Sequence, residues 1–129
     1  MWPARVWREK AWRYRNEASR CRRCGARHFP PRSMCDSCGG GDMETVQMAT
    51  TGKVLTFTVI RSAPPDLADQ VPYVVAVLEM DDGTRTMAQV VDVDPGAVRT
   101  GMLVRLEFRR IRQDRASGVI AYGHKAVPV

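Results

Sequence analysis

Two pairs of cysteines constrain the fold of this chain more than any other feature. Cys21 and Cys24 form one C-x-x-C pair, Cys35 and Cys38 form a second, and the sequence holds no other cysteine. A C-x-x-C turn can point two sulfurs at one position, and two such turns complete the tetrahedron that a structural Zn²⁺ prefers. The pattern therefore predicts a zinc ribbon in which these four cysteines bind the metal.

A pair of disulfides is the alternative use of four cysteines, and it requires an oxidising compartment. Residues 1–20 mix tryptophan, arginine and glutamate and contain no apolar run typical of a signal peptide. The longest apolar stretch, residues 71–78, is far shorter than the roughly 20 residues that span a membrane. We therefore expect a cytoplasmic protein with reduced thiolates that bind zinc.

Four thiolate ligands leave no coordination position for a water or a substrate, so the predicted zinc is structural and not catalytic. Binding free energies of roughly 10 to 16 kcal/mol are typical of such sites, which is enough to fold a segment without its own core. His28, beside Phe29-Pro30-Pro31, is the rival ligand near the cysteines. With four cysteines available, we expect His28 not to bind the metal.

The positive charge is concentrated in the first quarter of the chain. Residues 1–32 hold ten basic and two acidic side chains, a net charge of +8, whereas residues 33–129 hold ten basic and twelve acidic ones, a net charge of −2. The character of the sequence then changes to short strands after Gly39-Gly40-Gly41. We expect two units, with a helix and zinc ribbon in residues 1–44 and a barrel in residues 45–129.

An amphipathic helix is predicted over residues 5–18, which contain neither proline nor glycine. The pairs Glu9 with Arg13 and Arg13 with Glu17 have the i,i+4 spacing of favourable helical ion pairs. Apolar side chains recur at helical spacing at Trp7, Ala11, Tyr14 and Ala18.

The helix carries more large apolar side chains than one face can bury, because Trp2 and Trp12 lie off the stripe. One interpretation is a helix that packs on its own domain, and the other is a surface that binds a partner protein. Aromatic residues and arginine most often dominate the binding energy of protein interfaces. The residues that we assign to a partner surface are Trp7, Trp12, Tyr14, Arg20 and Arg23.

Several arginines surround the expected metal centre. Four thiolates and one Zn²⁺ carry a formal charge of −2, so nearby cations would offset that charge. Alternatively, the guanidinium groups form an anion site, because their planar forks match phosphate geometry. The sequence leaves both interpretations open for Arg20, Arg22, Arg23, Arg27 and Arg32.

Five short strands are predicted in the second unit. Asp81-Asp82-Gly83 is a turn, so the runs on either side of it form a hairpin. Five strands with long connections at 61–72 and 92–101 favour a Greek-key barrel of the OB type over a sandwich, which needs about seven strands. The fold class is therefore mainly β, with an N-terminal helix, a rubredoxin-like zinc ribbon and an OB barrel. The predicted strands are 53–60, 74–80, 84–91, 102–109 and 119–127.

Catalytic motifs are missing from this sequence. It has no phosphate-binding glycine loop, no G-x-S-x-G elbow and no cysteine beyond the two pairs. The carboxylate pairs at 81–82 and 92–94 each adjoin a glycine or proline, which is typical of solvated turns. His124 has no obvious acidic neighbour. We therefore predict a protein that is not itself an enzyme.

A family resemblance rests on motifs that occur in a fixed order along the whole chain. They are Ser19-Arg20-Cys21-Arg22-Arg23-Cys24-Gly25, Phe29-Pro30-Pro31-Arg32, Cys35-Asp36-Ser37-Cys38-Gly39, Gly52-Lys53-Val54 and Ala121-Tyr122-Gly123. Together with the basic aromatic helix, they resemble the acyl-CoA-associated OB-fold family with an N-terminal rubredoxin-like zinc ribbon, long catalogued as a domain of unknown function. The paired C-x-x-C motifs around F-P-P-R are the specific part of this resemblance.

The resemblance implies an accessory subunit that binds thiolase-superfamily enzymes and has no catalytic residues. Compact archaeal-type members, which this chain resembles in length and at Val71-Pro72-Tyr73-Val74, bridge acetoacetyl-CoA thiolase and HMG-CoA synthase in the mevalonate pathway of isoprenoid synthesis. Other members support acyltransferases or, with a hydratase-like partner, steroid side-chain aldolases. The family's zinc ligands correspond to the four cysteines, and coenzyme A or an acyl-CoA shared with the partner enzymes is a further expected ligand.

A nucleic-acid-binding protein is the competing class, because zinc ribbons and OB folds both occur in such proteins and the sequence pI is 9.6. A single-strand-binding barrel needs a positive groove with stacking aromatic residues. The predicted barrel has a negative net charge, and its aromatic residues mostly occupy strand positions expected to be core. They are Phe57, Tyr73, Phe108 and Tyr122. The charge distribution therefore favours protein partners over nucleic acid.

Overall fold

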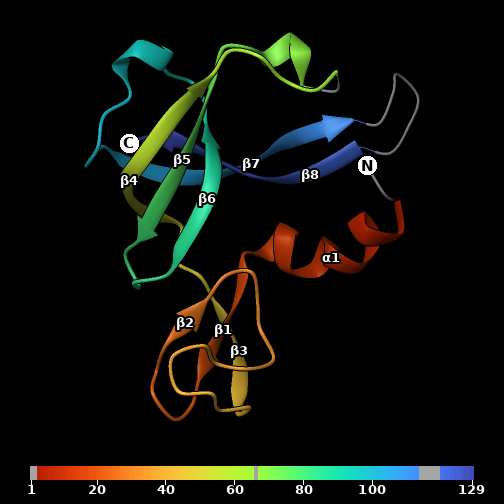
Figure 1. The fold of residues 1–129 in the computed structure, drawn as a ribbon, viewed down its shortest axis with the longest axis vertical. Helices are drawn as coiled ribbons and strands as arrows, with labels where there is room; N and C mark the ends of the chain where they lie inside the picture. Colours follow the sequence, from red (N-terminus) through yellow and green to blue (C-terminus); the bar gives the residue numbers. More distant parts are fainter. Residues whose placement is uncertain (1–2, 66, 114–119) are drawn as a thin grey trace.

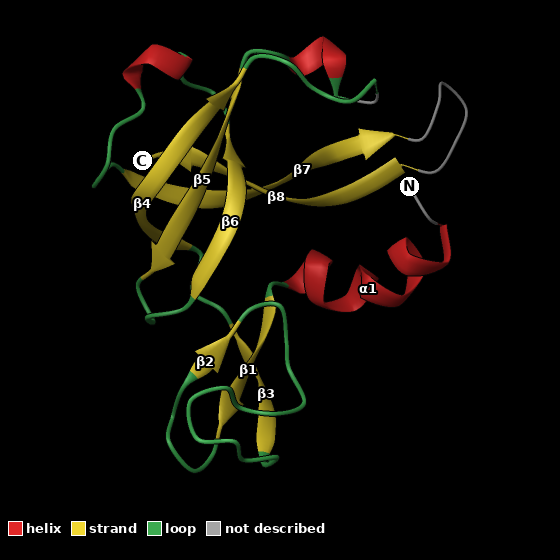
Figure 2. Cartoon of the chain, viewed as in Figure 1, coloured by secondary structure: helices red, strands yellow, loops and turns green. Residues whose placement is uncertain are grey.

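A computed structural model describes residues 3–65, 67–113 and 120–129 of the chain. A helix leads into a three-stranded sheet, and a closed five-stranded barrel follows (Figure 1). The predicted mainly β fold class is confirmed (Figure 2). The elements are α1 (Pro3–Arg15), β1 (Glu17–Cys21), β2 (Arg27–His28), β3 (Met43–Gln47), β4 (Thr51–Ile60), η1 (Ala68–Gln70), β5 (Tyr73–Met80), β6 (Arg85–Val90), η2 (Pro95–Ala97), β7 (Leu103–Gln113) and β8 (Ile120–Pro128).

Helix α1 ends at Arg15, earlier than the sequence predicted. Asn16 has a φ of 53°, in the left-handed region that asparagine tolerates better than most residues. Its carbonyl oxygen accepts a hydrogen bond from the backbone N–H of Met48 at 2.9 Å, which directs the chain into β1. Ala18 therefore belongs to a strand and is fully buried there, so its predicted place on the helical stripe is wrong.

The two ion pairs expected on the helix have different outcomes. The guanidinium Nη2 of Arg13 lies 2.6 Å from the carboxylate of Glu9, as the i,i+4 spacing predicted. Glu17 lies beyond the helix and pairs with Arg15 at 3.5 Å instead of with Arg13. The prediction for Glu17 is wrong because the helix stops before reaching it.

The ribbon is a small antiparallel sheet with the order β2-β1-β3. Strand β3 pairs with β1 from Met43 to Gln47, so the sheet runs through residue 44. The change in charge and the switch to short strands after Gly39-Gly40-Gly41 led us to expect the domain boundary at residue 44, and its position stays a prediction. Met48 follows the sheet and is buried in the apolar core, where the barrel begins.

The barrel has the strand order β4-β5-β6-β8-β7, which confirms the predicted closure of five strands. Strands β5 and β6 form the predicted hairpin, with Glu79 opposite Arg85 beside the turn. Strands β7 and β8 form the longest ladder and extend beyond the barrel (Figure 1). The remaining seam is short, because β6 meets β8 through one parallel pair, Val90 with Ala126.

The apolar core lies inside the barrel. Along most of strand β5, residues alternate between buried and half-buried. Its inner residues pack against those of the other strands. The buried apolar side chains of the barrel include Val54, Val74, Ala76, Leu78, Met80, Val90, Val104, Leu106 and Ala126.

Glycine is required at position 52, where β4 runs very close to β5. A Cβ atom at Gly52 would lie 2.5 Å from the backbone oxygen of Glu79 and 2.8 Å from the Cα of Met80. Both neighbours are backbone atoms, so no side chain can rotate away. The Gly-Lys-Val motif is thus explained by close strand packing.

The long connection after β4 is held against the barrel by Gln70. Its side-chain oxygen accepts hydrogen bonds from Gln89 at 3.1 Å and from the ammonium group of Lys125 at 3.3 Å. Burial lowers the pKa of Lys125, and the positive charges of Arg110 and Arg109 act in the same direction. This loop is therefore an ordered part of the barrel surface.

None of the helices formed by the described residues has the length and apolar character needed to cross a membrane.

Candidate metal centre and interaction surface

Two similar turns carry the four cysteines. In the first turn the backbone N–H of Gly25 donates to the carbonyl of Cys21 at 2.8 Å, and in the second Gly39 donates to Cys35 at 2.9 Å. Both glycines have a positive φ, 79° and 73°, which a residue with a side chain rarely adopts. A glycine directly after each C-x-x-C pair thus lets the chain wrap back under the two sulfurs.

The four sulfurs lie close together at one end of the ribbon. All four Sγ atoms are within 4.8 Å of one another. The Sγ atoms of Cys21 and Cys38 are 3.6 Å apart, and those of Cys24 and Cys35 are 3.5 Å apart. Zn–S bonds of about 2.3 Å in a tetrahedron place neighbouring sulfurs about 3.8 Å apart. The four cysteines therefore fit a tetrahedral zinc ion with little adjustment, and all four are free thiols.

The thiols influence one another's protonation strongly. The neighbouring His28 side chain, together with backbone N–H groups of the second turn, lowers the pKa of Cys35 to about 6. The backbone N–H of Ala26 favours the thiolate of Cys24, but its hydrogen bond with Cys35 and partial desolvation of the sulfur raise that pKa to about 12. Thiols this close cannot all ionise unless a cation lies among them. A divalent metal satisfies that electrostatic condition.

His28 lies outside the group of four sulfurs. Its side chain is 11% exposed, and its Nε2 atom is 3.5 Å from a carboxylate oxygen of Asp36. It forms a separate group with Cys35 and Asp36, whose ligand atoms lie within 4.8 Å of one another. The geometry thus brings the four cysteines together and leaves His28 beside one of them.

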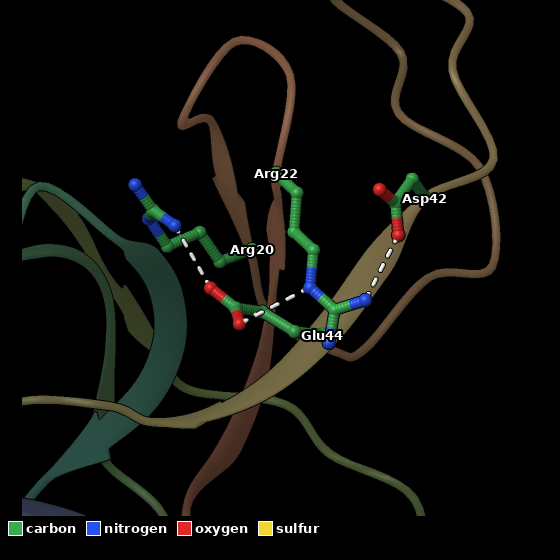
Figure 3. A network of polar contacts seen from close by, with 4 residues as sticks. All are labelled: Arg20, Arg22, Asp42 and Glu44. Carbon is green, nitrogen blue, oxygen red and sulfur yellow. Dashed lines mark hydrogen bonds and ion pairs between the residues drawn. The ribbon is translucent and has the colours of Figure 1, made fainter.

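Two of the arginines predicted to surround the metal are neutralised by carboxylates of the ribbon (Figure 3). Arg20 donates to Glu44 at 2.8 Å, and Arg22 contacts both Asp42 at 3.0 Å and Glu44 at 3.4 Å. The hydrogen bond from Arg20 lowers the pKa of Glu44. Sequence reasoning missed Asp42 and Glu44, because they approach the arginines only after β3 has paired with β1.

The other arginines differ in their surroundings. Arg27 lies 3.6 Å from Asp82, and with Arg32 and Arg85 it lines a polar cleft of about 280 Å³ between the ribbon and the β5–β6 turn. Arg23 is exposed and packs beside Gly40. No ion pair of Arg23 occurs within the described part of the chain. Charge compensation by carboxylates therefore explains Arg20 and Arg22 better than an anion site does.

The aromatic residues of α1 have different roles. Trp12 meets Phe29 of the ribbon edge-on, with ring centroids 5.4 Å apart, and Arg13 lies over its ring. Tyr14 meets Phe108 of the barrel edge-on at 5.3 Å. Trp7 is 73% exposed. Of the residues assigned to a partner surface, Trp12 and Tyr14 thus hold the helix on its own chain, while Trp7 is free to contact another protein.

An aromatic platform covers the outer half of the β7–β8 hairpin, and we define it as Tyr14, Phe108, Tyr122 and His124. Phe108 and Tyr122 stack with centroids 5.5 Å apart and are 49% and 37% exposed. Their expected core location is wrong, because the hairpin extends past the barrel and has no interior to face there. Strand alternation does not reveal where a barrel ends. Tyr73, by contrast, is buried as expected.

His124 attaches the hairpin to the helix. Its Nδ1 atom donates to the carbonyl oxygen of Arg13 at 3.1 Å, and burial lowers its pKa. The carboxylate of Glu107 on the neighbouring strand acts in the opposite direction, so the prediction that His124 has no acidic neighbour is wrong. The contact to a helix carbonyl gives this histidine a structural role.

Asp82 and Asp94 shape their turns, although Asp82 is only 17% exposed and is therefore not the solvated carboxylate that we expected. Asp82 accepts hydrogen bonds from the backbone N–H groups of Ala49 at 2.9 Å and Thr84 at 3.0 Å. Asp94 caps the short helix η2 by accepting from Gly96 at 3.0 Å. These contacts leave the carboxylates committed to shaping turns.

A second cleft of about 190 Å³ lies where helix, ribbon and barrel meet. It is lined mainly by apolar side chains from all three parts, including Trp12, Phe29, Met87 and Leu106. No sequence pattern indicated it, because it depends on how three separate elements come together.

Family models match both parts of the chain. Residues 15–44 match the rubredoxin-like zinc ribbon domain of ChsH2, and residues 45–109 match the C-terminal OB-fold domain of ChsH2.

Similar proteins cover nearly the whole chain. A DUF35 domain-containing scaffold protein of Methanocaldococcus jannaschii is 40% identical over 97% of this chain and 89% of its own length. The benzoylsuccinyl-CoA thiolase subunit BbsA of Geobacter metallireducens is 32% identical over 84% of this chain and 72% of its own length. The solved structure of the Ltp2-ChsH2(DUF35) aldolase is similar with a TM-score of 0.73 and 30% identity, covering 97% of this chain and 92% of that one. The chain therefore belongs to the DUF35 family of proteins that join a ChsH2-type zinc ribbon to a ChsH2-type OB fold.

Proposed function

We propose that this protein is a non-catalytic scaffold subunit that bridges acetoacetyl-CoA thiolase and HMG-CoA synthase and supports acetoacetyl-CoA transfer in the mevalonate pathway. The observation that carries the proposal is the similarity of the complete ribbon and barrel to an archaeal protein described as a scaffold. The described carboxylate pairs serve turns and caps, which is in keeping with a subunit that performs no chemistry.

Zinc has a structural role in this proposal. Cys21, Cys24, Cys35 and Cys38 would hold the ion, and its bound form supplies the cross-link that the ribbon needs in place of a core. The ribbon in turn fixes Phe29, against which Trp12 packs. The metal centre thus positions one end of α1.

Two surfaces are available for two enzymes. We assign α1 and the neighbouring ribbon to one enzyme, through the exposed Trp7 and the unpaired Arg23, with the partly covered Trp12, Tyr14 and Arg20 beside them. A face of the barrel contacts the other enzyme. Large exposed aromatic side chains and arginines are the residues that most often anchor protein interfaces.

The shared intermediate is an acyl-CoA, and its contact with this subunit is part of the proposal. Coenzyme A carries three phosphate groups, and arginine binds phosphate through paired hydrogen bonds. We place the complex in the cytoplasm, where thiols stay reduced and available to zinc.

Reconstitution tests the bridge directly. The purified protein would be mixed with the thiolase and the HMG-CoA synthase of the same host, and the species would be separated by size-exclusion chromatography with mass detection. We expect one ternary complex in fixed ratio. The Trp7→Ala variant should weaken binding of one enzyme by about tenfold or more, as for interface anchors in general. The matched control is Leu103→Ala, because Leu103 is also an exposed apolar residue (64% exposed) but lies on β7 and not on α1. We expect this variant to bind the enzyme that contacts α1 as tightly as the wild type does.

A second candidate is an accessory subunit of another thiolase-like enzyme, either an acyltransferase or an aldolase. The similarity to the thiolase subunit BbsA and to the Ltp2-ChsH2(DUF35) aldolase favours it. Capture of the tagged protein from its host, followed by mass spectrometry, separates the two candidates. Recovery of a thiolase-like enzyme without HMG-CoA synthase would replace the mevalonate assignment and retain the scaffold role.

Single-stranded nucleic acid is the third candidate, and the exposed Phe108 and Tyr122 are the observation in its favour. Stacked aromatic side chains next to cations are typical of single-strand binding. A gel-shift titration at increasing salt is the test, because phosphate contacts give a steep fall in affinity with salt. Recovery of nucleic acid without any enzyme would contradict the scaffold proposal.

A further inference from the structure

His28 carries a buried polar atom that needs an explanation. The residue lies in β2, where it pairs with Ser19 of β1, and its side chain is 11% exposed. Its Nε2 atom is buried and makes no well-formed hydrogen bond to any atom of the described residues. Buried nitrogen atoms without a partner are rare, and each one in a native protein has a specific cause.

Two groups lie close enough to be the missing partner. The Sγ atom of Cys35 and a carboxylate oxygen of Asp36 both lie within 4.8 Å of the imidazole. Asp36 is 59% exposed, and its oxygen is 3.5 Å from Nε2, which is long for a hydrogen bond. Because water solvates the Asp36 carboxylate, it has little need of the imidazole. Cys35 is only 2% exposed, so its sulfur depends on protein donors.

We propose that His28 is a positioning residue of the metal centre, whose Nε2–H donates a hydrogen bond to the zinc-bound thiolate of Cys35. A tetrathiolate zinc site carries a formal charge of −2, so a donor to one sulfur stabilises the thiolate without replacing it as a ligand. The donor in this role is the N–H at Nε2 of the ring. This role explains both the burial of the ring and its position outside the four sulfurs.

The four thiols differ in their surroundings. Cys35 is buried, and its sulfur has the imidazole of His28 beside it. Cys24 and Cys38, which are exposed, have no side-chain donor of this kind within the described residues. The two C-x-x-C turns are therefore unequal, and the second turn holds its buried sulfur more firmly.

The test uses the full-length protein loaded with zinc or with Co²⁺, whose thiolate charge-transfer absorption reports on the sulfurs. The variant His28→Phe keeps an aromatic ring but removes the donor, and His28→Gln restores an N–H at a similar reach. We expect His28→Phe to release zinc to a chelator about tenfold faster, as is typical for lost outer contacts to metal ligands. It should also shift the cobalt absorption to longer wavelength, because a thiolate without a hydrogen-bond donor transfers charge to the metal at lower energy. His28→Gln should reverse most of both changes.

Ser37→Ala is the matched control, because Ser37 is exposed, lies between two ligands and makes no side-chain hydrogen bond to another described residue. It should leave both readings unchanged. Equal spectra and release rates for the wild type and His28→Phe would overturn the inference. Equal changes in His28→Phe and His28→Gln would also overturn it, since ring packing alone would then explain them. A wild-type protein without a tetrahedral cobalt spectrum would overturn the metal centre and this inference together, whatever partner enzymes are found.

Discussion

The ribbon and the barrel are stabilised by different physical means. The barrel buries a continuous apolar core, with Leu78 and Val104 completely inaccessible to solvent. In the ribbon, the completely buried apolar residues are Ala18 and Cys21, and carboxylate–arginine pairs cover its surface. A segment with so little apolar burial cannot offset the entropy of ordering its chain. The comparison indicates that metal binding stabilises the ribbon, whereas burial of the apolar core stabilises the barrel.

Metal removal should give the largest effect and would separate the two regions. We expect chelation of zinc, or the Cys38→Ser substitution, to unfold residues 17–47 while the barrel stays folded, because a structural zinc site contributes roughly 10 to 16 kcal/mol. Backbone NMR of the zinc-bound and chelated protein checks this region by region. Simultaneous loss of the barrel signals would show that the two parts fold as one unit.

A core substitution tests the other side of the comparison. Leu78→Ala should lower the free energy of unfolding of the barrel by about 2 to 5 kcal/mol, because it leaves a cavity in a fully buried site. Zinc affinity should not change. Denaturant unfolding and a zinc-release assay are the measurements. Met87→Ala is the control, since Met87 is 70% exposed and should change stability little.

Gly52→Ala should give a smaller but still clear loss. The added Cβ would meet the backbone of Glu79 at 2.5 Å, so β4 and β5 must move apart. Steric crowding of this kind costs about 1 to 3 kcal/mol of folding free energy. Thermal unfolding measures it, with Gly41→Ala as the control because nothing lies within 4 Å of that position. Equal stability of the two variants would show that the strands have room to separate.

The smallest effect is expected at Glu44, and it should depend on pH. The pKa of this carboxyl group is lowered by Arg20 in the folded protein, so its contribution to stability is present above the ordinary carboxyl pKa. That contribution is lost as the pH falls through the lowered pKa. Glu44→Gln should therefore destabilise the ribbon slightly at neutral pH and not at acidic pH. A pH series of wild-type and variant unfolding curves measures the difference, and a difference independent of pH would exclude the charge as its cause.

Local patterns predicted most of the fold. The C-x-x-C spacing indicated where the four sulfurs lie, and alternation with turn residues located the strands and the β5–β6 hairpin. These features depend on residues near one another in the sequence. The early end of α1 at Asn16 could not be predicted in this way, because it depends on a hydrogen bond from Met48.

Long-range features of the site also escaped prediction. Glu44 neutralises Arg20 only because β3 pairs with β1 across the ribbon. The alternation of apolar and polar residues placed Phe108 and Tyr122 in the core. They are exposed because the β7–β8 hairpin extends beyond the barrel. Strand pairing and barrel length are properties of the assembled fold, and no window of sequence contains them.

The contact between α1 and the last strand has a consequence for biosynthesis. His124 of β8 binds the carbonyl of Arg13 across 111 residues of sequence, so helix α1 is synthesised well before this docking strand. Trp12 can meet Phe29 of the ribbon early, but the contact of the helix with the barrel must wait until β8 has been made. The cysteines, by contrast, all emerge within 18 residues of one another, from position 21 to 38, and can bind metal early. The ribbon can thus fold before the barrel during synthesis, and the helix docks on the barrel only afterwards.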